Sequence, residues 1–432
     1  MSTVPRVFLI EEQARAILGS STSGATRAVG LQLDDGDVFH VHLEPPTTPM
    51  TGYPCVALID TVAASPSPDT ARERAESAYR AQQAEHDWYG APHLIVVQLE
   101  RRPDRVGKRS FVFDRDGACV DAETFYVPTL SELYTRNQGL LRTEHMRERH
   151  VGIVGLGSGG STIAVELAKA GVGRFTLIDH DRLELGNVAR HVCGVSDLGR
   201  FKTKAVRERM LDKNPRIACI TDEIDINERL EQTEQLLADC HLIIGATDGD
   251  RSRLNLNAIA LASGTTAILG RAISRAAGGD VLRVRPHQGP CVACLFRHYE
   301  AQPDEISQRR QARSALPDYV SDADAEALVQ VGLSSDILPI STMMVKLALL
   351  ELSRGVDSGL ASLEEDLVAD LYVWANRRER AFRGFAPMGT GSRTPAVLRW
   401  YGARTERNPD CHVCGSLARD MEEDPIFAAA PA

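Results

Sequence analysis

One stretch of this 432-residue chain limits its fold more than any other. Residues 151–161 read VGIVGLGSGGS, so an apolar run leads directly into closely spaced glycines. A helical pattern follows, and a second apolar run over 175–178 stops at Asp179. The order strand, glycine turn, helix, strand and acid predicts a nucleotide site. Glycines let the backbone approach phosphate, the helix N-terminus turns N–H groups toward it, and the acid can hold ribose hydroxyls.

The bulk composition limits the partners and the cellular setting. A net charge of −10 and a pI near 5.7 argue against a nucleic-acid or anionic-membrane surface. No uncharged apolar run approaches the roughly 20 residues of a membrane span, and the run 7–10 is too short for a signal peptide. We therefore expect a cytoplasmic protein whose nine cysteines are free thiols or metal ligands.

At this length two or three domains are expected, and residues 1–128 predict a smaller α+β domain of their own. Its patterns indicate a polar helix over 69–86 and strands over 94–98 and 110–113. His40 and His42 share one face of an expected strand through pleating alone, so they are weak metal candidates. The order of elements resembles a JAB-type fold that has lost its metal.

Polar residues that could carry chemistry gather after the expected strand ends. They are Asp181, Asn187, Arg190, Lys202, Asp248, Arg253 and Asn257. With the glycine turn before them, their order and spacing over about residues 131–415 resemble the E1-like superfamily: the ThiF and MoeB sulfur-carrier adenylating enzymes and the ubiquitin-activating enzymes. The resemblance implies an α/β fold. Residues 129–432 would form a Rossmann-like adenylation domain with a mixed sheet, a structural zinc and an inserted crossover segment at about 295–335.

The resemblance also implies an activity, the ATP-dependent adenylation of the C-terminal carboxylate of a ubiquitin-like or sulfur-carrier protein. Both reactants are anions, so Arg190 and Lys202 would supply positive charge, and Asp248 would hold Mg²⁺. Asn187 would bind the phosphates. The remaining nucleotide contacts would come from the turn and the acids after it: Gly155, Gly157, Gly159, Gly160, Asp179 and Asp181.

Each of these roles has an alternative. Arg190 and Lys202 could be solvated surface charges, and Lys204 competes with Lys202 for the lysine role. Asp248 could cap the helix that follows it, and Gly249 stands where the family usually has Asn. On the function itself, the glycine turn alone would also fit a NAD-dependent oxidoreductase, and a non-catalytic scaffold could keep the same fold.

Arg136 is the residue on which the expectation of a homodimer depends. It matches an arginine that family members reach across a dimer interface toward the γ-phosphate, which would make the protein a homodimer. The segment around it, from residue 128 onward, is expected to be helical, with Thr129 or Ser131 as its cap. The alternative is an ordinary exposed arginine on the surface of that helix.

Two cysteine pairs predict a metal. Cys291 and Cys294, like Cys411 and Cys414, have the two-residue spacing that lets both thiolates bind one tetrahedral ion. Two such pairs fill the coordination sphere of zinc, so the zinc would be structural. The alternative is two unrelated redox or buried pairs.

The chain departs from many family members because no cysteine stands between residues 295 and 410. Either the reaction stops at the acyl-adenylate, or a serine such as Ser321 forms an oxyester before transfer to an E2-like partner. Cys193 lies nearest the ATP motifs, and we expect it to be buried and structural.

Overall fold

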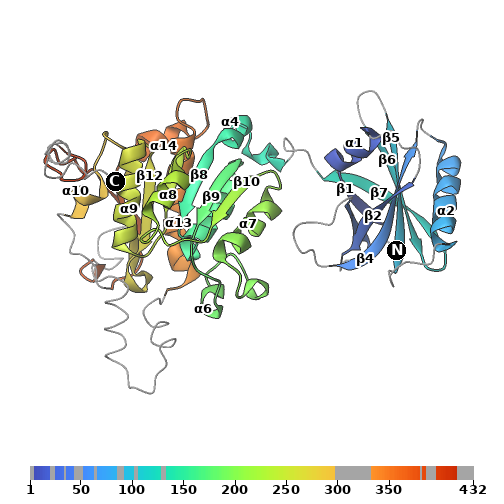
Figure 1. Cartoon of the computed structure of the whole chain (residues 1–432), viewed down its shortest axis with the longest axis horizontal. Helices are drawn as coiled ribbons and strands as arrows, with labels where there is room; N and C mark the ends of the chain where they lie inside the picture. Colours follow the sequence, from blue (N-terminus) through green and yellow to red (C-terminus); the bar gives the residue numbers. More distant parts are fainter. Residues whose placement is uncertain are drawn as a thin grey trace, which may run out of the picture. The chain divides into compact units, whose positions relative to one another are not determined.

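The computed structural model describes residues 4–19, 25–33, 36–42, 52–62, 66–84, 92–101, 106–127, 133–296, 332–379, 382–385 and 396–415. The chain divides into two compact units, Met1–Thr135 and Arg136–Ala432. Each unit has a sheet and a hydrophobic core of its own (Figure 1). Among the described residues, we find no helix with the length and hydrophobicity that crossing a bilayer requires.

The first unit is a closed barrel with the strand order β1-β3-β2-β4-β5-β6-β7. Its interior is filled by alternate residues of the strands, such as Val7 and Leu9 of β1. Helix α2 covers the outside of the barrel through Ala71, Ala75 and Tyr79, which are spaced four residues apart and buried. The elements are β1 (Arg6–Ile10), α1 (Glu11–Gly19), β2 (Ala25–Gln32), β3 (Val38–His42), β4 (Tyr53–Val62), α2 (Pro68–Ala84), β5 (His93–Arg101), β6 (Val106–Asp114) and β7 (Cys119–Val127).

The second unit is built on a mixed sheet, as predicted, with the order β10-β9-β8-β11-β12-β13-β14-β15. The strands from β10 to β12 are parallel, and those from β12 to β15 are antiparallel. The strands are β8 (His150–Val154), β9 (Arg174–Ile178), β10 (Ala218–Asp222), β11 (Leu242–Gly245), β12 (Ala267–Ala272), β13 (Gly278–Val284), β14 (Leu371–Ala375) and β15 (Arg399–Ala403). The chain order reverses between β8 and β11, and ligands of such sheets bind in the crevice at this reversal.

Helices cover both faces of this sheet, so its central strands are apolar on both sides. Val151 and Ile153 of β8 belong to one core cluster, and Val154 belongs to the cluster on the opposite face. The helices are α4 (Thr143–Glu148), α5 (Ser158–Lys169), α6 (Leu185–Val188), α7 (Lys202–Lys213), α8 (Leu230–Leu237), α9 (Asp250–Ser263), α10 (Val292–Phe296), α13 (Ser334–Leu352) and α14 (Ala361–Asp366). Three short 3-10 turns join them: η1 (Thr135–Asn137), η2 (Val195–Asp197) and η3 (Ser274–Ala276).

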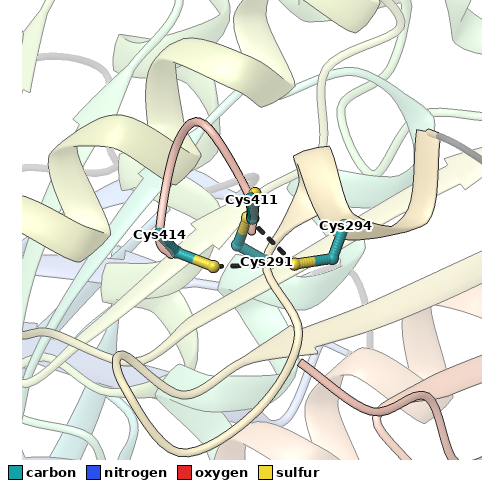
Figure 2. Close-up of side chains that lie close together, drawn as sticks. All are labelled: Cys291, Cys294, Cys411 and Cys414. Atoms are coloured by element: carbon teal, nitrogen blue, oxygen red, sulfur yellow. Dashed lines mark hydrogen bonds between the residues drawn. The ribbon is translucent and has the colours of Figure 1, made fainter. Parts of the chain in front are cut away.

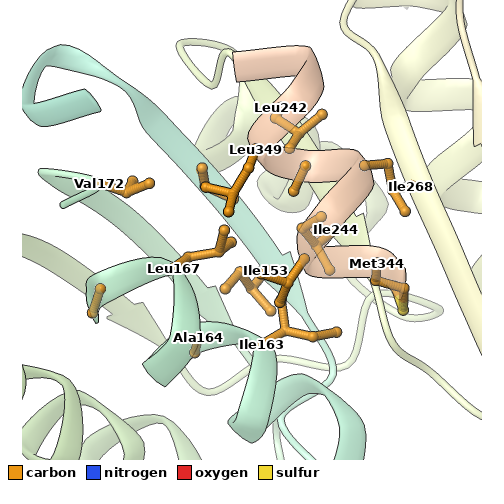
Figure 3. Close-up of a cluster of buried hydrophobic side chains, with 14 of the residues drawn as sticks. Ile153, Ile163, Ala164, Leu167, Val172, Leu242, Ile244, Ile268, Met344 and Leu349 are labelled. Carbon is orange, nitrogen blue, oxygen red and sulfur yellow. The ribbon is translucent and has the colours of Figure 1, made fainter. Parts of the chain in front are cut away.

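Helices α5 and α13 pack together over the middle of the sheet. Figure 3 shows Ile163 and Leu167 of α5 facing Met344 and Leu349 of α13, above Ile153 of β8. All these side chains are at most 7% exposed. This packing fixes the position of α5, and therefore also the position of the glycine turn from which α5 starts.

One local prediction needs correction. The apolar pattern after Pro339 predicts that a helix starts there, but α13 begins five residues earlier, at Ser334. Pro339 removes only the helix bond to the carbonyl of Ser335, and Ser335 is exposed to water near the helix N-terminus. Of the helix expected around Arg136, the described residues show Leu133 in helical conformation and then the 3-10 turn η1; Thr129 and Ser131 lie outside them.

Candidate functional site

The turn between β8 and α5 requires glycine at two positions. Gly155 has φ +87°, and a Cβ added there would lie 2.6 Å from the carbonyl oxygen of Ala246. A Cβ on Gly160 would lie 1.8 Å from the carbonyl oxygen of Gly155. The turn therefore packs directly against the end of β11. It places the N-terminus of α5, which begins at Ser158, in the crevice between β8 and β11.

Asp179 fixes the shape of this turn. Its Oδ2 accepts the N–H of Leu156 at 2.6 Å, and its Oδ1 accepts the N–H of Asp181 at 2.8 Å. The residue is 9% exposed. Each carboxylate oxygen has a second lone pair, so the acid can hold the turn and still accept a ribose hydroxyl.

Lys202 and Asp181 form a pair beside the turn. The Lys202 Nζ lies 2.7 Å from Asp181 Oδ2, and the Lys202 N–H donates to the Asp181 carbonyl at 3.0 Å. Lys202 is 8% exposed, so it is not a solvated surface charge. Lys204 is exposed and instead reaches Thr221 and Glu223, at the end of β10. Of the two lysines, Lys202 is the one positioned at the crevice.

Asn187 and Arg190 lie in the connection between β9 and α7. The amide oxygen of Asn187 accepts the N–H of Glu184 at 3.0 Å and closes the single turn of α6. Its carbonyl accepts the N–H of Arg190 at 3.0 Å. The Asn187 amide oxygen is thus engaged by the backbone, and a phosphate contact would use its N–H₂ group.

Asp248 follows the end of β11, next to the residues that pack on Gly155. It is exposed, and the N-cap of α9 is Gly249 rather than Asp248. The structure thus places Gly249, not Asp248, at the N-cap position of this helix. Its carboxylate stands at the same edge of the sheet as the glycine turn, where an oxygen ligand for a hard cation could act.

Arg253 and Asn257, which the motif also includes, are buried in the fold. Arg253 donates to Asp280 of β13 at 2.9 Å, and Asp280 also accepts from Arg271 at 2.8 Å. Arg271 in turn holds Asp250, in the first turn of α9, at 2.9 Å. The Asn257 amide oxygen accepts the N–H of Val292 at 2.9 Å. These residues tie α9 to the antiparallel half of the sheet and to α10.

The four predicted zinc ligands come together. Cys291 Sγ lies 3.8 Å from Cys294 Sγ and 3.8 Å from Cys411 Sγ, and Cys294 Sγ lies 3.5 Å from Cys414 Sγ (Figure 2). A tetrahedral zinc with Zn–S bonds of about 2.3 Å needs sulfurs about 3.8 Å apart, whereas a disulfide needs about 2.05 Å. All four residues are buried, at most 8% exposed. The cluster is therefore compatible with one zinc, and the two pairs are not unrelated.

The other predicted residues are less constrained. Arg136 is exposed on η1, at the start of the second unit. Cys193 is 1% exposed, and burial raises its pKa to about 11, which confirms its structural character. Ser321 and most of the expected crossover segment lie outside the described residues.

Sequence reasoning missed His191, which contacts the backbone of the glycine turn. Its Nε2 lies 2.8 Å from the carbonyl oxygen of Leu156, and its Nδ1 accepts the N–H of Cys193 at 3.0 Å. The only signal in the sequence is its position directly after Arg190.

Comparison with known proteins identifies proteins similar to this chain. The chain is 34% identical over 157 residues to the molybdopterin-synthase adenylyltransferase of Escherichia coli (strain K12), covering 36% of this chain and 61% of that protein. It is 29% identical over 177 residues to the sulfur carrier protein ThiS adenylyltransferase of the same strain, covering 40% and 65%. It thus spans less than two thirds of either relative. The crystal structure of E. coli MccB matches with a TM-score of 0.48 and 16% identity, over 67% of this chain and 73% of that one. The family model described as ThiF family matches residues 131–364, and the chain therefore belongs to the ThiF family, within the E1-like superfamily.

Proposed function

We propose that this protein is an ATP-dependent adenylating enzyme that activates the C-terminal carboxylate of a ubiquitin-like or sulfur-carrier protein. One observation carries the proposal: a glycine turn, an acid and a buried lysine meet at the switch point of the sheet, beside the loop that carries Asp248. The named relatives, two adenylyltransferases, support the reaction type.

In this proposal a carboxylate oxygen of the carrier attacks the α-phosphorus of ATP. A new P–O bond forms to the carrier, the bond to the bridging oxygen of the β-phosphate breaks, and pyrophosphate leaves. Bound Mg²⁺ would neutralise charge on the phosphates and the leaving pyrophosphate, with Asp248 as its protein ligand. Arg190 and Lys202 would hold the remaining charge, and for this the Lys202 ammonium would turn from Asp181 toward the phosphates.

The other groups position the nucleotide. The backbone N–H groups of the turn at Gly157, Gly159 and Gly160 and the N-terminus of α5 would face the phosphates. The Gly155 N–H donates to the Ile178 carbonyl, so Gly155 would act by letting the backbone come close to the nucleotide. Asp179 and Asp181 would accept the ribose hydroxyls, and the Asn187 amide would donate to a phosphate oxygen. We further propose a cytoplasmic homodimer in which Arg136 completes the partner's site, and onward transfer of the activated carrier to an E2-like protein.

Zinc in the four-cysteine cluster would be structural. A closed sphere of four thiolates leaves no position for a substrate, so the ion would stabilise the fold without entering the reaction. It would join the loop at Cys411 and Cys414 to the segment at Cys291 and Cys294.

Pyrophosphate exchange tests the proposed function. Labelled pyrophosphate should enter ATP when the protein is mixed with Mg²⁺ and a matching carrier from a panel that ends in Gly-Gly. Asp248→Ala should lower the exchange rate about 100-fold or more, because it removes a ligand of the charge-neutralising ion. Asp212→Ala, an exposed acid on α7, is the matched control and should leave the rate within about twofold.

Three outcomes would contradict the proposal. If Asp248→Ala leaves the rate of pyrophosphate exchange unchanged, the assignment of Asp248 as a magnesium ligand is wrong. Tight binding of NAD but not of ATP in a calorimetric titration would favour an oxidoreductase. ATP binding without exchange for any carrier would favour a non-catalytic scaffold.

A further inference from the structure

His191 forms hydrogen bonds on both sides of its ring, and both of its partners are backbone groups. The Cys193 N–H can only donate, so Nδ1 must be an acceptor without a proton. The Leu156 carbonyl can only accept, so Nε2 must carry the proton and donate to it. The two contacts together define one neutral tautomer, with the proton on Nε2.

The bond to Leu156 places His191 in the same hydrogen-bonded chain as the nucleotide residues. The Leu156 carbonyl accepts from His191 at 2.8 Å, and the Leu156 N–H donates to Asp179 at 2.6 Å. Asp179 also accepts from the Asp181 N–H, and Asp181 holds the Lys202 ammonium at 2.7 Å. Leu156 is therefore held on both sides, by His191 at its carbonyl and by Asp179 at its N–H, through two successive peptide groups of the turn.

We propose that His191 is a positioning residue for the nucleotide: its neutral ring holds the glycine turn through the Leu156 carbonyl and orders the loop that carries Arg190. The proposal rests on the proposed function only for the identity of the nucleotide as ATP. His191 contacts none of the reacting atoms. It acts because a turn held at Leu156 keeps its N–H groups aimed into the crevice before the nucleotide arrives.

This arrangement makes nucleotide binding sensitive to acid. Lys202 from α7 faces the ring and disfavours its protonation, whereas Asp179 after β9 and Asp197 of η2 favour it. Burial is the largest effect and lowers the pKa of His191 below its ordinary value of 6.5. As the pH falls through this lowered pKa, Nδ1 gains a proton and can no longer accept the Cys193 N–H. The Nε2–H keeps its bond to Leu156, so we expect ATP affinity to fall on the acid side by no more than about threefold, the loss expected when the Cys193 contact alone is removed.

Two variants separate the two hydrogen bonds of the ring. His191→Gln can place an N–H₂ group near the position of Nε2 and keep the bond to Leu156, and it has no titrating group. His191→Asn can place an oxygen near Nδ1 and keep the Cys193 contact, but it is too short to reach Leu156. We expect His191→Asn to weaken ATP binding about tenfold and His191→Gln by no more than about threefold.

The test uses the full-length protein and two readouts that do not require adenylation. Calorimetric titration with Mg-ATP from pH 5 to pH 8, an experimental range of about three units around the reference pKa, measures affinity. NMR of the imidazole nitrogens, with the signal assigned by its loss in His191→Gln, measures the tautomer. Thermal melting of each variant controls for folding.

The expected result is an Nε2–H tautomer at neutral pH and a ratio of wild-type to His191→Gln ATP affinity that falls by up to about threefold on the acid side, because the ratio cancels the titration of ATP itself. The proposal is overturned if the Nδ1–H tautomer is found, if His191→Asn binds ATP as well as the wild type, or if this ratio does not change with pH. A protein that passes these tests but exchanges no pyrophosphate would contradict the proposed function and leave the role of His191 intact.

Discussion

At the scale of single residues, the site depends on which charged side chains the fold removes from water. Lys202 is nearly buried against Asp181, while Lys204, two residues further along α7, is exposed and pairs with Glu223. A buried ammonium has few alternative partners and acts where water screens it little, so it can pass from Asp181 to a bound phosphate. Spacing in the sequence does not distinguish Lys202 from Lys204 as the lysine of the nucleotide site, but the burial of Lys202 does.

This choice predicts a difference between two matched variants. Lys202→Met should weaken ATP binding and lower pyrophosphate exchange about 100-fold, because the phosphates lose a fixed positive charge. Lys204→Met should change either quantity by no more than about twofold, since an exposed pair contributes little. Calorimetric titration and the exchange rate measure the two effects, with thermal melting as the folding control. Equal losses in the two variants would contradict the assignment.

At the scale of elements, the glycine turn is defined by close backbone contacts. Gly160 belongs to the first turn of α5 and packs on the Gly155 carbonyl, which itself packs on the residue after β11. The helix can therefore approach the strand ends only if no side chain stands between them. A Cβ on Gly157 would meet nothing within 4 Å, and this residue has a negative φ of −70°.

These two glycines give a test of the turn. Gly160→Ala should lower the free energy of unfolding by about 3 kcal/mol or more, because its Cβ would overlap a backbone oxygen that cannot rotate away. Gly157→Ala should stay within about 1 kcal/mol of the wild type. Chemical denaturation of both variants measures the difference. A Gly160→Ala protein as stable as Gly157→Ala would mean that the packing of the turn is wrong.

At the scale of the whole chain, the cysteine cluster joins segments far apart in sequence. Cys291 and Cys294 stand before the segment 297–331, while Cys411 and Cys414 follow β15, beyond the residues 131–364 that the family model matches. Asn257 binds the backbone beside this cluster, so α9, which starts next to Asp248, is connected to it. Order at the cluster therefore supports the position of the candidate magnesium ligand.

Metal removal tests this connection. We expect elemental analysis to find one zinc per chain, and we expect a chelator to lower the melting temperature by about 5–10 °C, because the buried thiolates lose the ion that neutralises them. Cys414→Ser should have a similar effect. Cys219→Ser, which changes a cysteine outside the cluster, should not. If neither the chelator nor Cys414→Ser changes the melting temperature, no metal stabilises the cluster.

The extent of sequence-based prediction differs between elements. Strands β5 and β6 contain the predicted strands 94–98 and 110–113 and extend beyond both. Pro339 predicts a helix start, yet α13 begins at Ser334, because a proline near a helix N-terminus removes little bonding. Asp248 is a candidate cap by its place in the sequence, yet the N-cap position of α9 is Gly249. Local patterns predict the elements, and their ends depend on neighbours.

By itself, the sequence determined the order of strand, glycine turn, helix and acid and the pairing of cysteines two residues apart, because these follow from short-range periodicity and spacing. The mixed α/β class followed from the resemblance to the family. Only the tertiary structure decided that Lys202 rather than Lys204 faces the crevice, that Arg253 and Asn257 brace α9, and that His191 holds the turn. Such contacts join residues that lie far apart in the sequence or on different faces of one element. Their energies depend on burial, which arises only when the sheet and its helices have packed.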